Sequence, residues 1–407
     1  MNTISDIYRE ILSKDNPLQA FSFLAIESIF LIYTAAFAVR THFFGSLDRV
    51  SVKMKYPTVG CKTVISLIGL FCGPMVVPSE DWIFLESAWN NSSIVCLALL
   101  VGACIVFKPK KERACVESVR HAIFFQSLGT MASPLMRVNF LLGAYGSIVL
   151  LLVYTVHTVI LIQRADSTQA STECIESRKN SLFKRVLDLV VCSAKEECSP
   201  NLGMFVSPVV MGSVICCTFL SLCIKSLFLS VSALFALCAF VRHTKKTSIF
   251  RCAYTLACIC VLLRCASEHL YLAFSCAFPE IKVHPFVRLS LATARLMLPT
   301  SVVIAVGIWM GKYMQCLSIG LSLPIHYMFF QRSIFNLAMK NQNSIPLVNR
   351  TSPCTLIFTV ISTMLIFLNN EVRTGLFEVE VGALLILLYF IYFTCLVFCP
   401  IPRAAPS

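Results

Sequence analysis

Apolar runs long enough to cross a membrane fill most of this chain, and short polar gaps separate them. Two of these runs are 204–224 and 379–399. A helix of about 20 residues, at about 1.5 Å per residue, matches a hydrocarbon layer roughly 30 Å thick. Hydrophobic residues make up 57% of the sequence and charged residues only 14%, which leaves too little polar surface for a water-soluble globule. The predicted fold class is all-α: a polytopic membrane bundle of about 10–12 transmembrane helices, with a transporter-like arrangement as one option.

We assign twelve spans, of which the third, seventh and eleventh are short. They cover residues 19–39, 58–78, 91–107, 118–136, 139–162, 204–224, 226–241, 252–277, 289–311, 314–334, 353–369 and 379–399. Only three residues separate the fourth span from the fifth, so counts of ten and eleven also stay open. A dozen spans leave no room for a soluble domain of ordinary size.

The longest gap divides the predicted spans into two groups. The predicted parts are a short outward segment 1–18, a first group of about five spans in 19–162, a cytoplasmic loop 163–203, a second group of about seven spans in 204–399 and a tail 400–407. Within the loop, residues 181–191 place Leu182, Val186 and Leu189 on one helical face. This pattern fits either an amphipathic helix at the lipid headgroups or a solvated loop.

Basic residues predict which gaps face the cytoplasm. The first, third, fifth and seventh gaps together hold 18 Lys and Arg residues, whereas the second holds none and the fourth and sixth hold one each. Because cytoplasmic loops carry an excess of Lys and Arg, the odd-numbered gaps are expected in the cytoplasm and both termini outside. This distribution explains the net charge of +13 without a nucleic-acid partner.

Three N-x-Ser/Thr sequons fall in gaps that the charges place outside. Asn90-Asn91-Ser92 and Asn91-Ser92-Ser93 overlap, and Asn349-Arg350-Thr351 stands alone. Asn90, Asn91 and Asn349 are therefore candidate glycosylation sites in outer loops.

Arg264, Glu268 and His269 form the main polar group inside a predicted span. Ionisable side chains in hydrocarbon cost a few kcal/mol each, so they indicate a buried partner or an aqueous path. A spacing of four residues places Arg264 and Glu268 on one helix face, where they can pair. The pair can line a polar cavity, or it can be neutralised internally and hold neighbouring helices together. Both interpretations stay open.

Other polar residues inside spans are more isolated in the sequence. Glu27 has no base within a turn, so it is expected to be protonated or to meet a base from another helix, for which Arg295 is the candidate. Arg295 can instead extend to the interface alone. His157 and His326 are lone histidines, and we expect hydrogen-bonded core residues rather than proton relays or ligands.

The sequence contains no stretch typical of an enzyme. It has no glycine-rich phosphate loop, no H-E-x-x-H and no serine nucleophile elbow, and Cys258-Ile-Cys260 lies within a span. We therefore predict no catalytic residues, no metal site and no cofactor. Most of the 21 cysteines lie in spans, where a free thiol behaves as a small buried hydrophobe.

Taken whole, the chain resembles the alphaherpesvirus multi-pass envelope membrane proteins of the unique-long-forty-three type, in particular those of varicella-like viruses. The shared features are about 400 positions, the spans, Cys- and Phe-rich helices such as 213–220, and one sizeable hydrophilic loop at 164–202. The resemblance implies a non-enzymatic protein of the virion envelope and host membranes. Its implied role is accessory, modulating fusion or the trafficking of viral glycoproteins.

That family is in turn similar, distantly, to equilibrative nucleoside transporters. Those proteins carry an acid followed four residues later by Arg in the eighth span, whereas this chain has the reverse order, Arg264-x-x-x-Glu268. They also have eleven spans, with the main loop after the sixth. The alternative function is thus a nucleoside-type solute transporter with a midplane polar site built from Arg264, Glu268 and Glu27.

Overall fold

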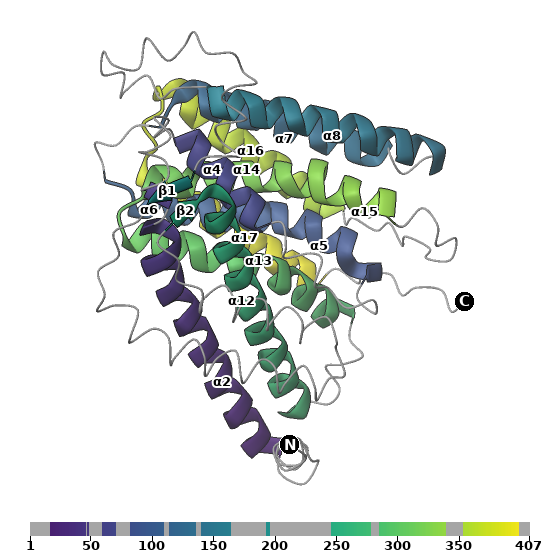
Figure 1. Cartoon of the computed structure of the whole chain (residues 1–407). Helices are drawn as coiled ribbons and strands as arrows, with labels where there is room; N and C mark the ends of the chain where they lie inside the picture. Colours follow the sequence, from purple (N-terminus) through teal and green to yellow (C-terminus); the bar gives the residue numbers. More distant parts are fainter. Residues whose placement is uncertain are drawn as a thin grey trace. The chain divides into compact units, whose positions relative to one another are not determined.

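The computed structural model shows an almost entirely α-helical protein (Figure 1). It describes residues 17–45, 47–48, 59–70, 82–109, 114–135, 140–163, 193–195, 246–277, 285–338 and 353–398. These residues belong to two compact units, each built from stretches distant in the sequence: one from 1–55, 68–77 and 179–306, the other from 56–67, 78–178 and 307–407. We describe the two units separately. The division of the chain at the loop 163–203 stays a prediction.

The first unit is organised around two helices that run along each other. They are α2 (Pro17–Ala38), which continues into the π-helical segment η1 (Val39–Phe44), and α12 (Ile249–Ala277). The rings of Phe21 and Phe274 meet edge to face, with centroids 5.6 Å apart, near the N-terminus of α2 and the C-terminus of α12. The two helices are therefore antiparallel. The unit also contains most of α13 (Pro285–Trp309) and the strands β1 (Ser193–Lys195) and β2 (Lys246–Ser248).

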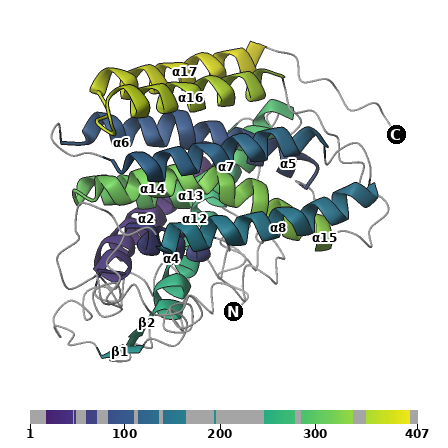
Figure 2. The ribbon, with the colours of Figure 1, turned by 90° about the horizontal axis from the view of Figure 1, so that it is seen from above.

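The second unit is a bundle of long helices with similar axes (Figure 2). Its elements are α4 (Val59–Leu70), α5 (Trp82–Ile94), η4 (Val95–Leu100), α6 (Val101–Phe107), α7 (Val116–Leu135), α8 (Phe140–Gln163), α14 (Tyr313–Ile325), η8 (His326–Gln331), α15 (Arg332–Ala338), α16 (Pro353–Val372) and α17 (Val379–Phe398). Of α4, residues up to Leu67 belong to this unit. A π-helical segment joins α5 to α6, and another joins α14 to α15, so each forms one continuous helix. Helices α16 and α17 lie side by side, joined by the short turn 373–378.

Ten of the twelve predicted spans fall wholly or partly on described residues and are almost entirely helical there, and the last two have ends close to those predicted. The predicted spans 204–224 and 226–241 lie outside the described residues. Helix α16 covers 353–372 against a predicted 353–369, and α17 covers 379–398 against a predicted 379–399. Serine and threonine hydroxyls inside these helices bond to the carbonyl four residues earlier, as Ser28 does to Leu24 and Thr359 to Thr355. Such bonds satisfy the hydroxyl within its own helix, which suits an apolar surrounding.

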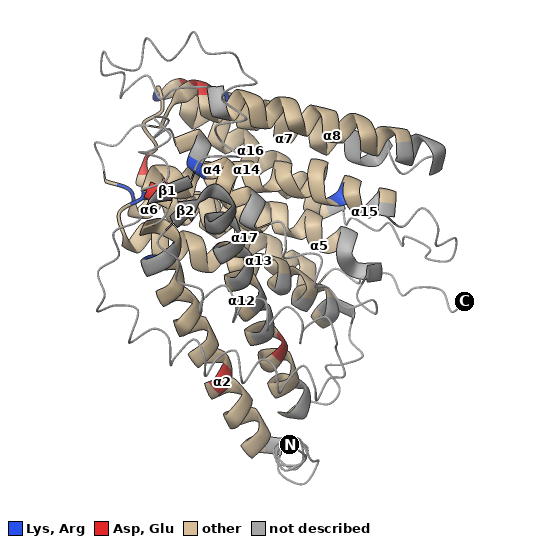
Figure 3. Ribbon diagram, in the orientation of Figure 1, with Lys and Arg blue, Asp and Glu red and all other residues tan. Residues whose placement is uncertain are grey.

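In the part of the chain that the structure describes, four helices are long and apolar enough to cross a membrane: Leu18–Ala38, Ser87–Phe107, Cys354–Val372 and Val379–Phe398. Large apolar side chains are exposed along several helices, among them Leu152 on α8, Met364 on α16 and Phe390 on α17. Among the coloured residues of Figure 3, many of the charged ones lie near helix ends, with exceptions inside α2, inside α12 and inside the continuous helix that ends with α15. Apolar side chains that point outward along a whole helix suit contact with lipid.

Within each unit, gaps that were predicted to share a membrane side do lie together. In the second unit the backbone N–H of Ala114, in the third gap, donates to the carbonyl of Gly375 in the eleventh, over 2.9 Å. In the first unit β1 of the fifth gap pairs antiparallel with β2 of the seventh, with Lys195 opposite Lys246. Both contacts join odd-numbered gaps, which were predicted to share a side; the cytoplasmic placement of these gaps stays a prediction.

Candidate functional site

The first buried polar contact joins α2 to α12. Oε2 of Glu27 lies 3.6 Å from Nδ1 of His269, whose side chain is fully buried, while that of Glu27 is 13% exposed. Glu268, the preceding residue on α12, is also buried. Since Glu27 and His269 come from helices more than 200 residues apart in sequence, their contact fixes the register between α2 and α12.

The structure thus unites part of the predicted intramembrane polar site. It places Oε2 of Glu27 3.6 Å from Nδ1 of His269 on another helix; the expected partner was Arg295, and a protonated Glu27 was the other alternative. The side chains of Arg264 and Arg295 lie outside the described residues, although both positions are helical, in α12 and α13. The Arg264–Glu268 pair and the Glu27–Arg295 pair therefore stay predictions.

The second buried polar group is a histidine cluster in the other unit, made of His121 on α7, His157 and Tyr154 on α8, and His326 on η8. The rings of His121 and His157 are stacked, with centroids 5.3 Å apart and planes 11° apart. The hydroxyl of Tyr154 lies 2.7 Å from Nδ1 of His326, and its ring centroid lies 6.3 Å from that of His157. The expectation of a hydrogen-bonded core residue is confirmed for His326; His157 is also buried in the core, but its ring nitrogens have no hydrogen-bond partner among the described residues. The sequence did not predict that three spans each contribute one histidine ring to this cluster.

A third polar group lies among α5, α16 and α17. The Tyr392 hydroxyl donates a short hydrogen bond to Oδ1 of Asn91, and it lies 3.3 Å from the Thr355 hydroxyl. Asn90 and Asn91 were expected in an outer loop, but they lie within α5 with side chains only 7% and 5% exposed. The loop placement was wrong because the helix begins nine residues before the predicted start of the third span, at Trp82. Asn349 lies outside the described residues.

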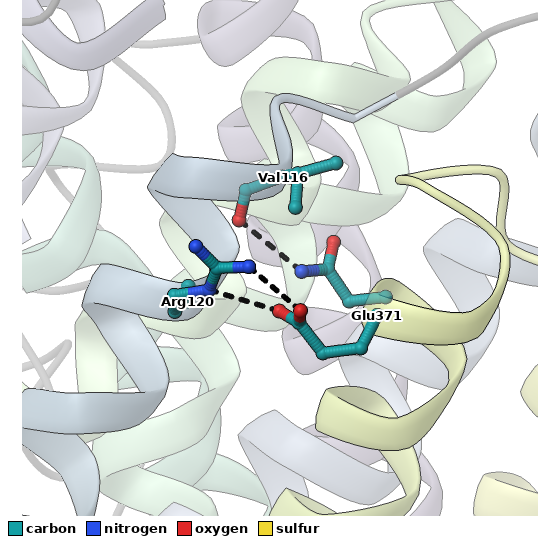
Figure 4. A network of polar contacts seen from close by, with 4 residues as sticks. Val116, Arg120 and Glu371 are labelled. Carbon is teal, nitrogen blue, oxygen red and sulfur yellow. Dashed lines mark hydrogen bonds and ion pairs between the residues drawn. The ribbon is translucent and has the colours of Figure 1, made fainter.

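A fourth polar group ties α7 to the end of α16 (Figure 4). Arg120 donates to both carboxylate oxygens of Glu371, from Nε over 3.0 Å and from Nη2 over 2.6 Å. The side-chain amide of Asn370 donates to the carbonyl of Val116 over 3.1 Å. Next to these bonds, Gly375 adopts a φ of +80°, and a Cβ there would collide with the carbonyl of Ala114. Glycine alone suits this close approach with a left-handed backbone.

These four groups share one property. Each joins groups from different helices; the first three have members that are buried, whereas Arg120 and Glu371 of the fourth are partly exposed. Among the described residues, no group of three or more His, Cys, Asp or Glu side chains is placed to hold a metal ion. The arrangement can hold helices together through polar bonds, and its histidines and carboxylates can bind protons.

Neither a family model nor a curated protein matches the sequence. The fold, however, is similar to that of a solved structure of the sodium–calcium exchanger NCX_Mj, soaked with Na⁺ and Sr²⁺. The similarity has a TM-score of 0.52 at 12% sequence identity, and it covers 94% of this chain and 99% of the exchanger chain. The protein is a polytopic α-helical membrane protein. At so low an identity, the likeness concerns the transporter-like helical fold alone.

Proposed function

We propose that this protein is a non-enzymatic, accessory protein of a viral envelope and of host membranes, acting through contacts with other membrane proteins. The viral part of the proposal rests on the resemblance of the whole chain to alphaherpesvirus envelope proteins. The partners we propose are viral membrane glycoproteins, whose fusion activity or trafficking the protein would modulate.

The observation that carries this proposal is the use of interior polar groups as bonds between helices. Tyr392 bonds to Asn91, Thr63 donates to Ser318 over 2.9 Å, and Tyr154 bonds to His326. Hydrogen bonds between transmembrane helices contribute about 0.6–2 kcal/mol each. Such bonds stabilise the helix bundle. The outer faces of the bundle then remain available for contacts with other membrane proteins.

The outer face of α17 is a surface on which a membrane partner could pack. Leu387, Phe390 and Phe393 are exposed there by 55%, 57% and 41%. Helices in a bilayer associate by side-chain packing, and an apolar face of this kind can meet lipid or another helix equally well.

The test is to express the tagged full-length chain in cells that produce enveloped particles carrying the viral glycoproteins. We expect the protein in purified particles and, after mild solubilisation, in complexes with a glycoprotein. A variant with Leu387, Phe390 and Phe393 changed to Ala should lose the complex but keep its expression. A matched variant with Val360, Ile361 and Met364 of α16 changed to Ala controls for general loss of apolar surface. Absence of the wild-type protein from particles would contradict the proposal.

The second candidate function is transport of a solute or ion, and two observations favour it. The fold is similar to that of a sodium–calcium exchanger, and the carboxylates Glu27 and Glu268 lie buried or nearly buried within helices. If these carboxylates bind the transported species, Glu268→Gln should abolish uptake of labelled nucleosides, Na⁺ or Ca²⁺ into proteoliposomes. Glu380→Gln changes an exposed carboxylate at the start of α17 and should leave uptake unchanged. No uptake by folded wild-type protein would remove this candidate.

A further inference from the structure

The histidine cluster of the second unit runs from a half-buried position near the start of α7, where Nε2 of His121 is itself buried, to two fully buried positions. His121 lies on the second turn of α7, directly after Arg120, whose side chain is 56% exposed, and His121 itself is half-buried. His157 and His326 are 0% and 1% exposed. Ring contacts link the three helices: His121 stacks on His157, the ring centroid of Tyr154 lies 6.3 Å from that of His157, and the Tyr154 hydroxyl is hydrogen-bonded to His326.

His157 stands at the centre of the cluster and is its least satisfied member. Neither of its ring nitrogens has a hydrogen-bond partner among the described residues, although its side chain is fully buried. A buried polar group without a partner costs about 1–3 kcal/mol, so native structures keep few of them. The stacked rings of His121 and His157 present their faces to each other, so passage of a proton between their nitrogens requires rotation of a ring about χ2.

The charges around His157 limit how many protons the cluster can hold. The titratable groups that face it from the packed helices are His121 of α7, Tyr154 of α8 and His326 of η8. The charged residues of α7 closest in sequence to His121, Glu117 and Arg120, lie toward the exposed end of that helix, where Arg120 is bonded to Glu371. No described carboxylate belongs to the cluster, so two positive imidazoles would repel each other without compensation.

We propose that His121, His157 and His326 form a proton-binding site that takes up a single proton from the aqueous phase through His121. The proton passes from a hydronium ion or a buffer acid to the lone pair of a ring nitrogen, no other bond is formed or broken, and the cluster gains one positive charge. Tyr154 can follow this change, because its hydroxyl donates to a neutral Nδ1 of His326 and accepts from a protonated one. This activity is separate from the contacts proposed above.

The experiment uses the full-length protein in nanodiscs with ¹⁵N-labelled histidine, because imidazole ¹⁵N shifts report both protonation and tautomer. The chain contains 7 histidines, and single His→Gln variants assign the signals. As the pH falls from about 8 to about 5, the range in which histidines ordinarily titrate, the signals of His121, His157 and His326 should move in one shared transition. Total uptake in that transition should be one proton per chain.

Variants of the cluster distinguish two cases: one proton shared by the three histidines, or three histidines that titrate independently. His157→Gln should lower the proton affinity of His326 about tenfold, which is about one pH unit in its midpoint. His269 of the other unit serves as the internal control, and its signal should stay unchanged. If His157→Gln disturbs the fold, Tyr154→Phe replaces it and should also shift the midpoint of His326. Independent transitions, no transition in this range, or a His326 midpoint unmoved by the variants would overturn the proposal.

Discussion

The guanidinium of Arg120 meets the carboxylate of Glu371 in a two-pronged contact, with hydrogen bonds of 3.0 and 2.6 Å. The two residues are 251 positions apart, and together with the bond from Asn370 to Val116 they hold the start of α7 against the end of α16. Charged pairs with this fork geometry are more specific in orientation than single contacts. The turn 373–378 is thereby fixed beside Ala114.

Arg120→Ala should loosen this turn without unfolding the bundle, because the pair is largely exposed. We expect amide hydrogen exchange at residues 370–376 to become faster and the double exchange Arg120→Glu with Glu371→Arg to restore it. Arg373→Ala is the matched control, since Arg373 bonds to Glu378 within the same turn. Equal exchange rates in the wild type and Arg120→Ala would mean that the pair does not fix the turn.

Tyr154→Phe removes the hydroxyl that bonds to His326 and should destabilise the second unit by about 1 kcal/mol, the usual net contribution of a hydrogen bond. The measurement is the thermal midpoint of the purified protein in detergent. Tyr145→Phe in the same helix alters a side chain that is 69% exposed and should leave the midpoint unchanged. A larger effect from the control than from Tyr154→Phe would contradict the assignment of this bond.

Gly102 and Gly382 let α6 and α17 approach closely. A Cβ on Gly382 would lie 2.8 Å from the carbonyl oxygen of Gly102, and one on Gly102 would lie 2.9 Å from that of Gly382. Gly382→Leu should therefore lower stability by about 1–3 kcal/mol or more, because the backbones must separate. Ala383→Leu adds bulk to an exposed position of the same turn and is expected to be neutral. Similar losses in both variants would contradict the close packing.

The sequons at Asn90 and Asn91 should carry no glycan, because both amides lie inside α5 and Asn91 accepts a bond from Tyr392. Ser92→Ala with Ser93→Ala destroys both sequons yet keeps the asparagines, and the two hydroxyls bond only to carbonyls of their own helix. We expect this variant to migrate like the wild type before and after glycosidase treatment. If the wild type carries a glycan that the variant lacks, the segment is exposed during or after folding. Asn349→Gln is the parallel test of the third sequon.

Hydropathy predicted the helices that the structure describes, but it did not predict which helix faces meet. An apolar run fixes length along the membrane normal, and it contains no information on rotation about the helix axis. Glu27 was recognised as needing a base, yet its contact with His269 depends on the register between α2 and α12. His121 was missed, since a single histidine near a helix end resembles any interfacial residue. A signal was available in the three histidines that fall within three separate spans.

The start of the third span was predicted too late because of four polar residues. Asn90, Asn91, Ser92 and Ser93 lower the local hydropathy, so the predicted span began within them. In the structure this polar segment is helical and buried, because Tyr392 and the carbonyls of α5 satisfy its side chains. A hydrogen-bond partner from a distant helix thus allows a segment that was expected in a loop to lie in a buried helix.

The most direct test of the account is the side of the membrane on which three segments of the second unit lie. Gln126 bonds to Met328 and Phe329 packs beside Gly129, so α7 runs in the same direction as the continuous helix of α14 and η8. The turn 373–378 meets Ala114, just before α7. The starts of α7 and α14 and this turn are therefore expected on one side of the membrane. Lys110→Cys, Lys312→Cys and Arg373→Cys variants are treated with a membrane-impermeant maleimide and mapped by peptide mass spectrometry. They report separately on the predicted third gap, the start of α14 and the turn 373–378. We predict that all three cysteines stay unlabelled in intact cells and become labelled after permeabilisation. Labelling of one segment in intact cells while the other two stay protected would contradict the membrane arrangement proposed for this chain.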